Sequence, residues 1–210
     1  RYEDWRATIA SVIRTEAELG LPVILFGASM GGMLAYDAAA LTGVPVGLVA
    51  TCLLEPRNQD VRRAMVRWAW MAGLIEPSLC TFSSLSDSLP IPMKLVSNMG
   101  AITNLPELTK AIVDDPKAGG NWMPAGFLRT FLMAEPVVPP AKFDVCPVLL
   151  VHPEQDHWTD VSLSLTFLER LRRVKTDFKL LEDGGHFPVE QKAVEQFQQA
   201  VAEFVVGLNI

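Results

Sequence analysis

The sequence predicts an α/β fold in which a parallel sheet with flanking helices is interrupted by a helical segment. Four short strand-like segments occur along the chain, three of them apolar runs, and a segment of helical periodicity follows each of them. Strand and helix alternate closely, as they do in right-handed βαβ units. A proline-rich stretch between the second and third runs has helical patterns but contains no strand-like run.

Residues 1–55 predict the first part of the core. A helix over about Asp4–Leu19 has apolar residues at helical spacing and leads into a strand at Pro22–Phe26. A second helix runs from about Met30 to Leu41. The second strand, Val46–Leu54, is apolar throughout, which is typical of a strand buried on both faces of a parallel sheet.

Residues 56–140 predict a helical cap inserted after the second strand. Apolar residues from Val61 to Ala72 recur at the spacing of an amphipathic helix. Shorter helices, separated by proline and glycine, are expected around Pro92–Met99, Leu105–Val113 and Pro124–Ala134.

Residues 141–210 predict the second part of the core. A strand at Pro147–Val151 precedes a helix from about Asp160 to Val174. A last strand at Asp177–Leu181 is followed by a helix whose inner side includes Ala193 to Phe204.

Composition and charge exclude several classes of protein. A chain of 210 residues, 50% of them hydrophobic, can bury one good core and perhaps a small subdomain. The net charge of −6 provides no basic face, so we expect no nucleic-acid partner. The apolar runs are shorter than the roughly 18 residues of a membrane helix, so no transmembrane segment is expected.

Cysteine and histidine patterns predict neither a metal site nor a cofactor. Cys52, Cys80 and Cys146 are scattered and form no Cys-x-x-Cys pair, which argues against a disulfide framework and a structural zinc site. The three histidines form no helical ligand pair. Because the thiols are expected to be reduced and no signal peptide starts the chain, a cytoplasmic location is the expectation.

The stretch Gly27-Ala28-Ser29-Met30-Gly31 joins a strand to a helix without a loop. Gly27 and Gly31 are expected where a Cβ would strike the neighbouring backbone. The Ser29 hydroxyl then projects at a helix N-terminus, where the Met30 N–H could donate to a developing oxyanion. Ser29 could instead cap the helix, but the flanking glycines favour a nucleophile.

Ser29, Asp156 and His186 each lie just past the end of a predicted strand. The carboxyl ends of parallel strands meet at one edge of a sheet, so these side chains can converge there. A serine needs a base, and the base works best when a carboxylate orients it. We therefore expect Ser29 to be the nucleophile, His186 the general base and Asp156 the acid that holds it.

Other residues compete for the role of the acid. Asp156 could instead cap the helix that starts near Asp160. Its rivals are Glu154, Asp160 and Glu55. His152 and His157 are expected to be structural or to line a pocket.

Three motifs carry a resemblance to a known family. They are the stretch around Ser29, the acid loop His152-Pro153-Glu154-Gln155-Asp156, and the histidine loop Gly185-His186-Phe187-Pro188-Val189-Glu190. Together they resemble the serine hydrolases of the α/β-hydrolase superfamily, and most closely the monoacylglycerol-lipase-like or lysophospholipase-like esterases. Serine, acid and histidine also follow one another in the chain order of that superfamily.

The resemblance implies the C-terminal half of an α/β-hydrolase fold, with the N-terminal strands missing, since a complete sheet has more strands than the four predicted here. The strand at 23–26 would then be an apolar edge, which soluble proteins avoid exposing. We expect a missing N-terminal segment or a partner chain to cover it. The loop that carries the second oxyanion donor in the family is absent, and Ala28 stands where many members have histidine.

The resemblance also implies a lipase-like serine esterase that needs no cofactor. We expect it to cleave a small-molecule carboxylic ester with an apolar acyl or alcohol part, through an acyl-enzyme on Ser29. The same residues would suit an amide, a peptide or a C–C bond, and a non-catalytic binding or scaffold relative is the third possibility. The residues expected to line the substrate pocket are Ala28, Met65, Trp68 and Trp158.

Overall fold

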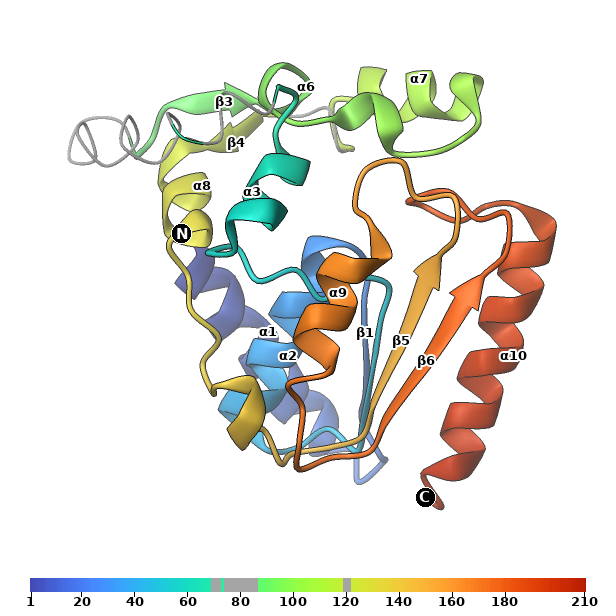
Figure 1. Ribbon diagram of the computed structural model, residues 1–210. Helices are drawn as coiled ribbons and strands as arrows, with labels where there is room; N and C mark the ends of the chain where they lie inside the picture. The colour runs from blue at the N-terminus through green and yellow to red at the C-terminus, as the bar shows by residue number, and fades with distance from the viewer. Residues whose placement is uncertain (69–72, 74–86, 119–121) are drawn as a thin grey trace.

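A parallel sheet of four strands forms the centre of the structure, a computed structural model that describes residues 1–68, 73, 87–118 and 122–210. The strand order is β1-β2-β5-β6, and every neighbouring pair is parallel (Figure 1). The strands are β1 (Ile24–Gly27), β2 (Gly47–Ala50), β5 (Val148–Pro153) and β6 (Thr176–Leu181). The predicted parallel sheet is confirmed.

The two central strands are buried along their whole length. Every residue of β2 and of β5 is buried, because helices cover both faces of the sheet at these strands. This explains why both segments are apolar runs without alternation.

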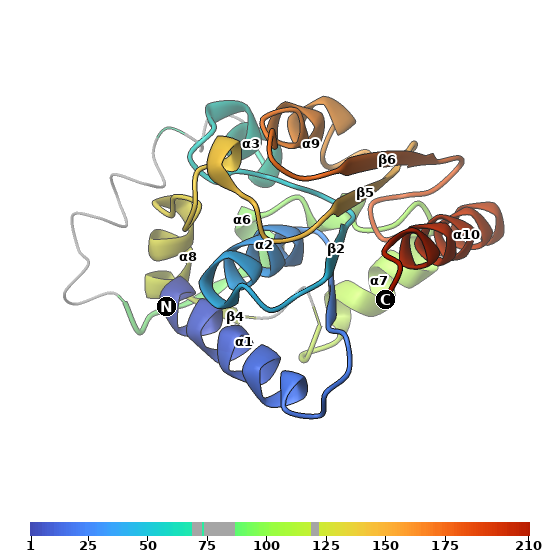
Figure 2. The same ribbon diagram turned by 90° about the horizontal axis from the view of Figure 1, so that it is seen from below.

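Helices cover the two faces of the sheet. α2 (Met30–Thr42) and α9 (Val161–Leu168) lie on one side and α10 (Gln191–Gly207) on the other (Figure 2). The larger core cluster joins Tyr36 of α2 and Phe167 of α9 to the strands, and a second cluster joins Phe204 of α10 to the opposite face. α1 (Tyr2–Ala17) packs on α2. The predicted helices are confirmed, although α9 ends at Leu168, earlier than expected.

Residues 56–140 contain short elements, most of which lie beyond the carboxyl ends of the strands (Figure 1). Their helices agree with the predicted segments, but a two-stranded antiparallel ribbon was not predicted. Each of its strands has only three residues and includes proline, so no strand pattern marks it in the sequence. The elements are α3 (Gln59–Met65), β3 (Pro90–Pro92), α6 (Met93–Val96), η2 (Met99–Ala101), α7 (Pro106–Asp114), β4 (Trp122–Pro124), α8 (Ala125–Leu132) and η3 (Pro140–Lys142).

Two sequence observations fall outside the described residues. They are the expected continuation of α3 to Ala72 and the thiol of Cys80. The other two cysteines, Cys52 and Cys146, are buried and free. In the described part of the chain, no helix combines the length and the apolar character needed to cross a membrane.

Asp37 on α2 connects three segments of the chain. Its buried carboxylate accepts hydrogen bonds from the Tyr2 hydroxyl and from Arg6, both on α1. The N–H of Val137, in the segment that leads back to β5, also donates to it. Burial raises the pKa of Asp37 despite these bonds and the charge of Arg6. The residues after α8 are thereby fixed to the core helices.

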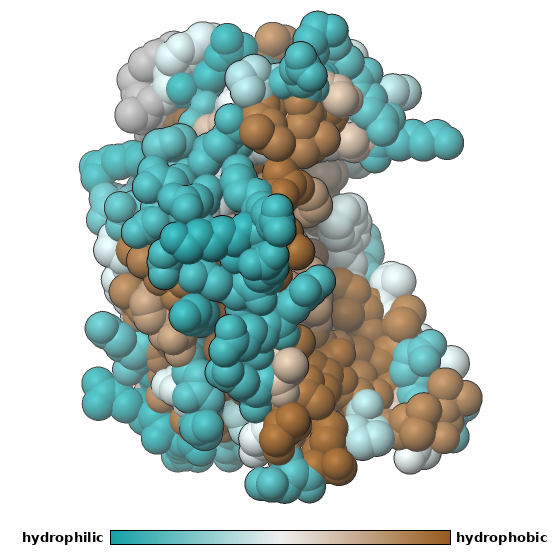
Figure 3. Space-filling view, turned by 90° about the vertical axis from the view of Figure 1, so that its right-hand side faces the viewer, coloured by the Kyte–Doolittle hydropathy of each residue, from teal (hydrophilic) through white to brown (hydrophobic). Residues whose placement is uncertain are grey.

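β1 forms one edge of the sheet and pairs only with β2 among the described residues. Its Phe26 side chain is 57% exposed, and Leu19 and Leu21 just before the strand are also exposed. The space-filling view that faces α10 shows hydrophobic surface beside the polar outer side of this helix (Figure 3). An apolar strand edge is therefore accessible in this chain.

Candidate active site

Ser29 occupies a strained turn between β1 and α2. Its φ of 51° and ψ of −124° lie in a region that side chains rarely adopt, and such strain often marks a functional site. A Cβ on Gly27 would lie 2.3 Å from the Gly31 carbonyl oxygen, so the expectation for Gly27 is confirmed. The expectation for Gly31 is wrong, because a Cβ there meets open space. The second glycine that the turn requires is Gly32, whose Cβ would lie 1.9 Å from the Cys52 carbonyl oxygen.

The structure brings Ser29, His186 and Asp156 together. His186 Nδ1 lies 2.8 Å from Asp156 Oδ2, and His186 Nε2 lies 2.8 Å from Ser29 Oγ. Since a carboxylate only accepts, Nδ1 carries the proton, and Nε2 can accept the Ser29 hydroxyl proton. Within the described residues, that hydroxyl caps no amide of α2, so Ser29 does not act as a side-chain cap.

Asp156 is held by its own loop. Its Oδ1 accepts the backbone N–H groups of Trp158 and Thr159, and its Oδ2 accepts the Thr159 hydroxyl at 2.8 Å. Burial raises the pKa of this carboxyl, but the hydrogen bond and charge of His186, together with the bonds from Thr159, bring it below its usual value. Asp156 is therefore ionised at neutral pH.

The three rivals of Asp156 have other partners. Glu154 accepts the N–H of Asp183, and Asp160 caps α9 by accepting the N–H of Ser162. Glu55 forms an ion pair with Arg170. Among the carboxylates considered, the structure places only Asp156 on His186.

The loop that carries His186 is fixed by Glu190 and by the segment after η2. Glu190 Oε2 accepts the N–H groups of Gly185 and Val189. The Phe187 N–H donates to the carbonyl of Ile102, and a Cβ on Gly185 would lie 2.9 Å from Asn104. Residues of the predicted cap thus contact the histidine loop directly.

Sequence analysis missed two supporting residues, Thr51 and Thr159, and did not specify what His152 supports. The hydroxyl of Thr51 accepts the Ser29 N–H at 2.8 Å, and Thr159 binds Asp156 as described. His152, which we expected to be structural or pocket-lining, is fully buried beneath them. Thr51 follows β2 and His152 lies near the end of β5, so the convergence of strand ends could have identified both.

A cavity of about 250 Å³ opens beside Ser29. Its lining is mainly apolar and includes Ala28, as expected, directly after the carboxyl end of β1. Thr51 and His186 contribute polar groups. The other lining residues are Phe26, Ser29, Ile102, Phe187, Pro188, Val194 and Phe197.

The other three residues expected in the pocket lie elsewhere. Met65 packs in hydrophobic clusters at the end of α3, and Trp68 is 48% exposed. Neither of them lines the cavity beside Ser29. Trp158 contacts the His186 ring, with ring centroids 4.7 Å apart, but it is not part of the cavity lining.

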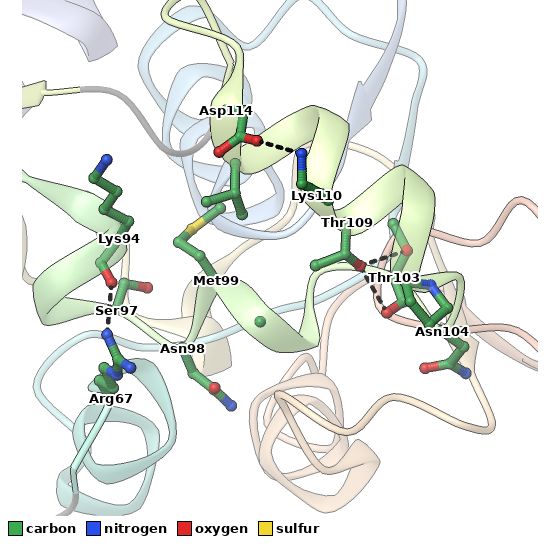
Figure 4. A pocket seen from close by; sticks show the side chains of 13 residues that line it. Arg67, Lys94, Ser97, Asn98, Met99, Thr103, Asn104, Thr109, Lys110 and Asp114 are labelled. Atoms are coloured by element: carbon green, nitrogen blue, oxygen red, sulfur yellow. Dashed lines mark hydrogen bonds and ion pairs between the residues drawn. The ribbon is translucent and has the colours of Figure 1, made fainter.

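Arg67 and twelve residues between Lys94 and Asp114 line a second, larger cavity of about 530 Å³ (Figure 4). None of Ser29, Asp156 and His186 lines it. Its cations do not converge on one point, because Lys110 turns to Asp114 while Arg67 donates to the Lys94 carbonyl. Ser29 and His186 instead line the smaller cavity.

One group of potential metal ligands occurs in the described residues. Atoms of Cys52, Asp156 and His186 lie within 4.8 Å of one another. Burial raises the pKa of Cys52 to about 12, so its thiol stays protonated. The other two residues already bind each other through the atoms that a metal would need. This chemistry favours a hydrogen-bonded cluster over a metal centre.

The chain is similar to known hydrolases in sequence pattern and in fold. A sequence model of the Alpha/beta hydrolase family matches residues 1–200. A monoacylglycerol lipase of Paleococcus ferrophilus superposes with a TM-score of 0.71 and 21% identity, over 99% of this chain and 76% of that chain. A soluble variant of the Saccharomyces cerevisiae monoglyceride lipase gives a TM-score of 0.73 and 14% identity, over 99% and 69%.

A further similar structure is Est1E of Butyrivibrio proteoclasticus, with a TM-score of 0.56 and 18% identity, over 99% of this chain and 71% of that chain. No curated protein matches the sequence. At these identities the likeness to solved structures establishes the fold, and the family match is consistent with it.

Proposed function

The chain belongs to the alpha/beta hydrolase family, and on this basis we propose that it is a serine hydrolase that cleaves a carboxylic ester. The observation that carries the proposal is the pair of 2.8 Å contacts that link Ser29 Oγ to His186 and His186 to Asp156. Nucleophile, base and orienting carboxylate have the arrangement that activates a serine hydroxyl.

In the proposed reaction, His186 Nε2 takes the Ser29 proton as Oγ attacks the ester carbonyl. Asp156 stabilises the imidazolium that forms. The Met30 N–H lies in the first turn of α2, where no intrahelical acceptor is available, and it donates to the oxyanion. His186 then protonates the leaving alcohol, and water releases the acid from the acyl-enzyme on Ser29 by the same steps.

The cavity supports an ester with an apolar acyl or alcohol part. Side chains such as Phe26, Ile102 and Phe197 line it, and His186 is the one ionisable side chain other than the serine and threonine hydroxyls among its lining residues. An apolar group would bury its surface there, while an ionised substrate group would lose its hydration without a partner. Two of the similar structures are a monoacylglycerol lipase and a monoglyceride lipase, which supports the same substrate class.

The test compares Ser29→Ala with Ser162→Ala, a control at an exposed serine on α9. We expect Ser29→Ala to lower the turnover of a p-nitrophenyl ester by at least about a thousandfold and to abolish labelling by a fluorophosphonate probe. Ser162→Ala should react like the unmodified chain. Retained labelling of Ser29→Ala would identify another nucleophile, and an unmodified chain that never labels would contradict the proposal.

A panel of substrates is needed to identify which type of bond is cleaved. Esters, anilides and a C–C-bonded diketone of matched acyl length share the same acyl-transfer geometry. The proposal predicts that kcat/KM is highest for the ester. If the anilide or the diketone were preferred, Ser29 would still be the nucleophile, but the reaction would be the cleavage of an amide or a C–C bond.

A further inference from the structure

A fully buried histidine, His152 near the end of β5, lies behind the reactive cluster. Its Nδ1 is 3.0 Å from the carbonyl oxygen of Thr51, and its Nε2 is 3.1 Å from the carbonyl oxygen of Thr159. Both contacts have the length of hydrogen bonds. One imidazole thus joins the residue after β2 to the acid loop.

Both contacts can be hydrogen bonds only if both ring nitrogens carry protons. A carbonyl oxygen accepts and cannot donate, and a neutral imidazole has only one N–H. The second contact in a neutral ring would bring two lone pairs together. A negative charge is close enough to compensate an imidazolium, since Asp156 Oδ2 lies 3.8 Å from His152 Nε2.

The two residues that His152 joins hold the two ends of the reactive cluster. Thr51 accepts the N–H of Ser29, and Thr159 donates to Asp156. The thiol of Cys52 provides a second, weaker connection between Thr51 and Thr159. The Thr51 hydroxyl lies 3.9 Å from the Cys52 thiol, which is 3.6 Å from the Thr159 hydroxyl. Nucleophile and acid are therefore connected beneath His186 as well as through it.

We propose that His152 is a positioning residue of this site, held as an imidazolium that fixes the acid loop to the end of β2 and balances the charge of Asp156. The part of the proposal that concerns catalysis rests on the proposed hydrolase function. The protonation state of His152 does not depend on that function, and it is tested separately.

The added positive charge has a consequence for pH dependence. It adds to the electrostatic field at the reactive cluster, so the pH profile of the reaction should depend on it. The other titratable groups near His152 are Asp156, Asp160 at the start of α9 and the protonated thiol of Cys52. Both carboxylates favour the imidazolium form, and the neutral thiol does not oppose it.

The protonation state is read directly by ¹⁵N NMR of the imidazole nitrogens. The chain has three histidines, so the double variant His157→Gln, His186→Gln contains only His152. At about pH 7.5, where an exposed histidine is mostly neutral, we expect two protonated nitrogens in the folded protein. A single protonated nitrogen at that pH would overturn the proposal, whatever the outcome of the activity assays.

The positioning role is tested with His152→Gln and His152→Asn, which keep an amide donor near the place of Nε2 or Nδ1 but carry no charge. We expect each to lower the rate of fluorophosphonate labelling by about tenfold and to change the pH profile of that rate. The control is His157→Gln, an exposed histidine of the same loop, which should leave both unchanged. A lower rate with an unchanged pH profile, in variants that circular dichroism shows to be folded, would contradict the charge role.

Discussion

At the scale of single residues, the reactivity proposed for this site depends on groups that bind the reactive side chains. Asp156 accepts three hydrogen bonds from its own loop besides that of His186, and two of them come from backbone N–H groups. The backbone bonds persist in most variants. The Thr159 hydroxyl is the one loop donor that a substitution can remove without altering the chain path.

Thr159→Val should lower kcat/KM for an ester by about tenfold, because it removes a hydrogen bond to a buried carboxylate and puts a methyl group in its place. The matched control is Thr166→Val, since the Thr166 hydroxyl donates to a backbone carbonyl on the exposed side of α9. Equal rates for both variants would show that the Thr159 hydroxyl does not support Asp156.

The lowered pKa of Asp156 predicts how stability depends on pH. Hydrogen bonds and the charge of His186 outweigh burial, so the folded carboxyl holds its proton less tightly than an unfolded one, whose pKa is about 3.9. Its contribution to stability is complete above that value and is lost as the pH falls through the lower, folded pKa. Asp156→Asn should therefore be less stable than the unmodified chain at neutral pH, with a gap that narrows in acid.

Chemical denaturation at a series of pH values measures this gap in the free energy of unfolding. A gap of constant size between neutral pH and about pH 3 would show that the ionisation of Asp156 does not stabilise the folded chain.

The sequence predicted that Ser29, Asp156 and His186 converge because each of them follows a predicted strand. It did not predict which residues support them. Thr51 and Thr159 are ordinary polar residues in the sequence, and their roles depend on distances between loops that only the folded chain sets. The pocket expectations for Met65 and Trp68 rested on a helical stripe, which does not specify what it faces.

At the scale of elements, the turn between β1 and α2 shows what a motif can and cannot specify. Gly27 and Gly31 are spaced symmetrically around Ser29, and symmetry suggested equal roles. The structure gives the second role to Gly32, because α2 crosses close to the residues after β2 and a Cβ there would strike the Cys52 carbonyl. This contact lies between segments distant in sequence, so local spacing could not reveal it.

Gly31→Ala and Gly32→Ala form a matched pair that tests this assignment. Gly31→Ala should be neutral or should stabilise the chain by up to about 1 kcal/mol, since alanine favours a helix and the site is open. Gly32→Ala should destabilise it by about 3 kcal/mol or more, because backbone atoms must shift. Urea denaturation measures both, and equal stabilities would refute the close approach.

The boundaries of helices and strands were predicted most accurately where the sequence pattern is strongest. Most of the long helices and strands were predicted within a few residues, since their periodicity extends over whole elements. The helix expected to reach Val174 ends at Leu168, and the strand expected to reach Leu54 ends at Ala50. The ribbon of β3 and β4 was not predicted, because pairing between Pro90–Pro92 and Trp122–Pro124 is a tertiary contact of short segments.

At the scale of the whole molecule, the two edges of the sheet differ in a way that affects association. The outer strand β6 contains Asp177 and Lys179, and charged residues at an edge discourage pairing with another strand. The opposite edge, β1, has the sequence Ile24-Leu25-Phe26-Gly27 and carries no charge. The earlier expectation that a further segment or chain covers this edge therefore remains a prediction.

For the 210-residue chain alone, we expect copies to associate through β1. Lysine at Phe26 would place a charge on that edge, so Phe26→Lys should lower the average mass measured by light scattering at high protein concentration. The control is Phe178→Lys on β6, where the side chain is 43% exposed beside residues that are already charged; it should leave the mass unchanged. A monomeric chain at every concentration, or an equal effect of both substitutions, would show that β1 is not the associating edge.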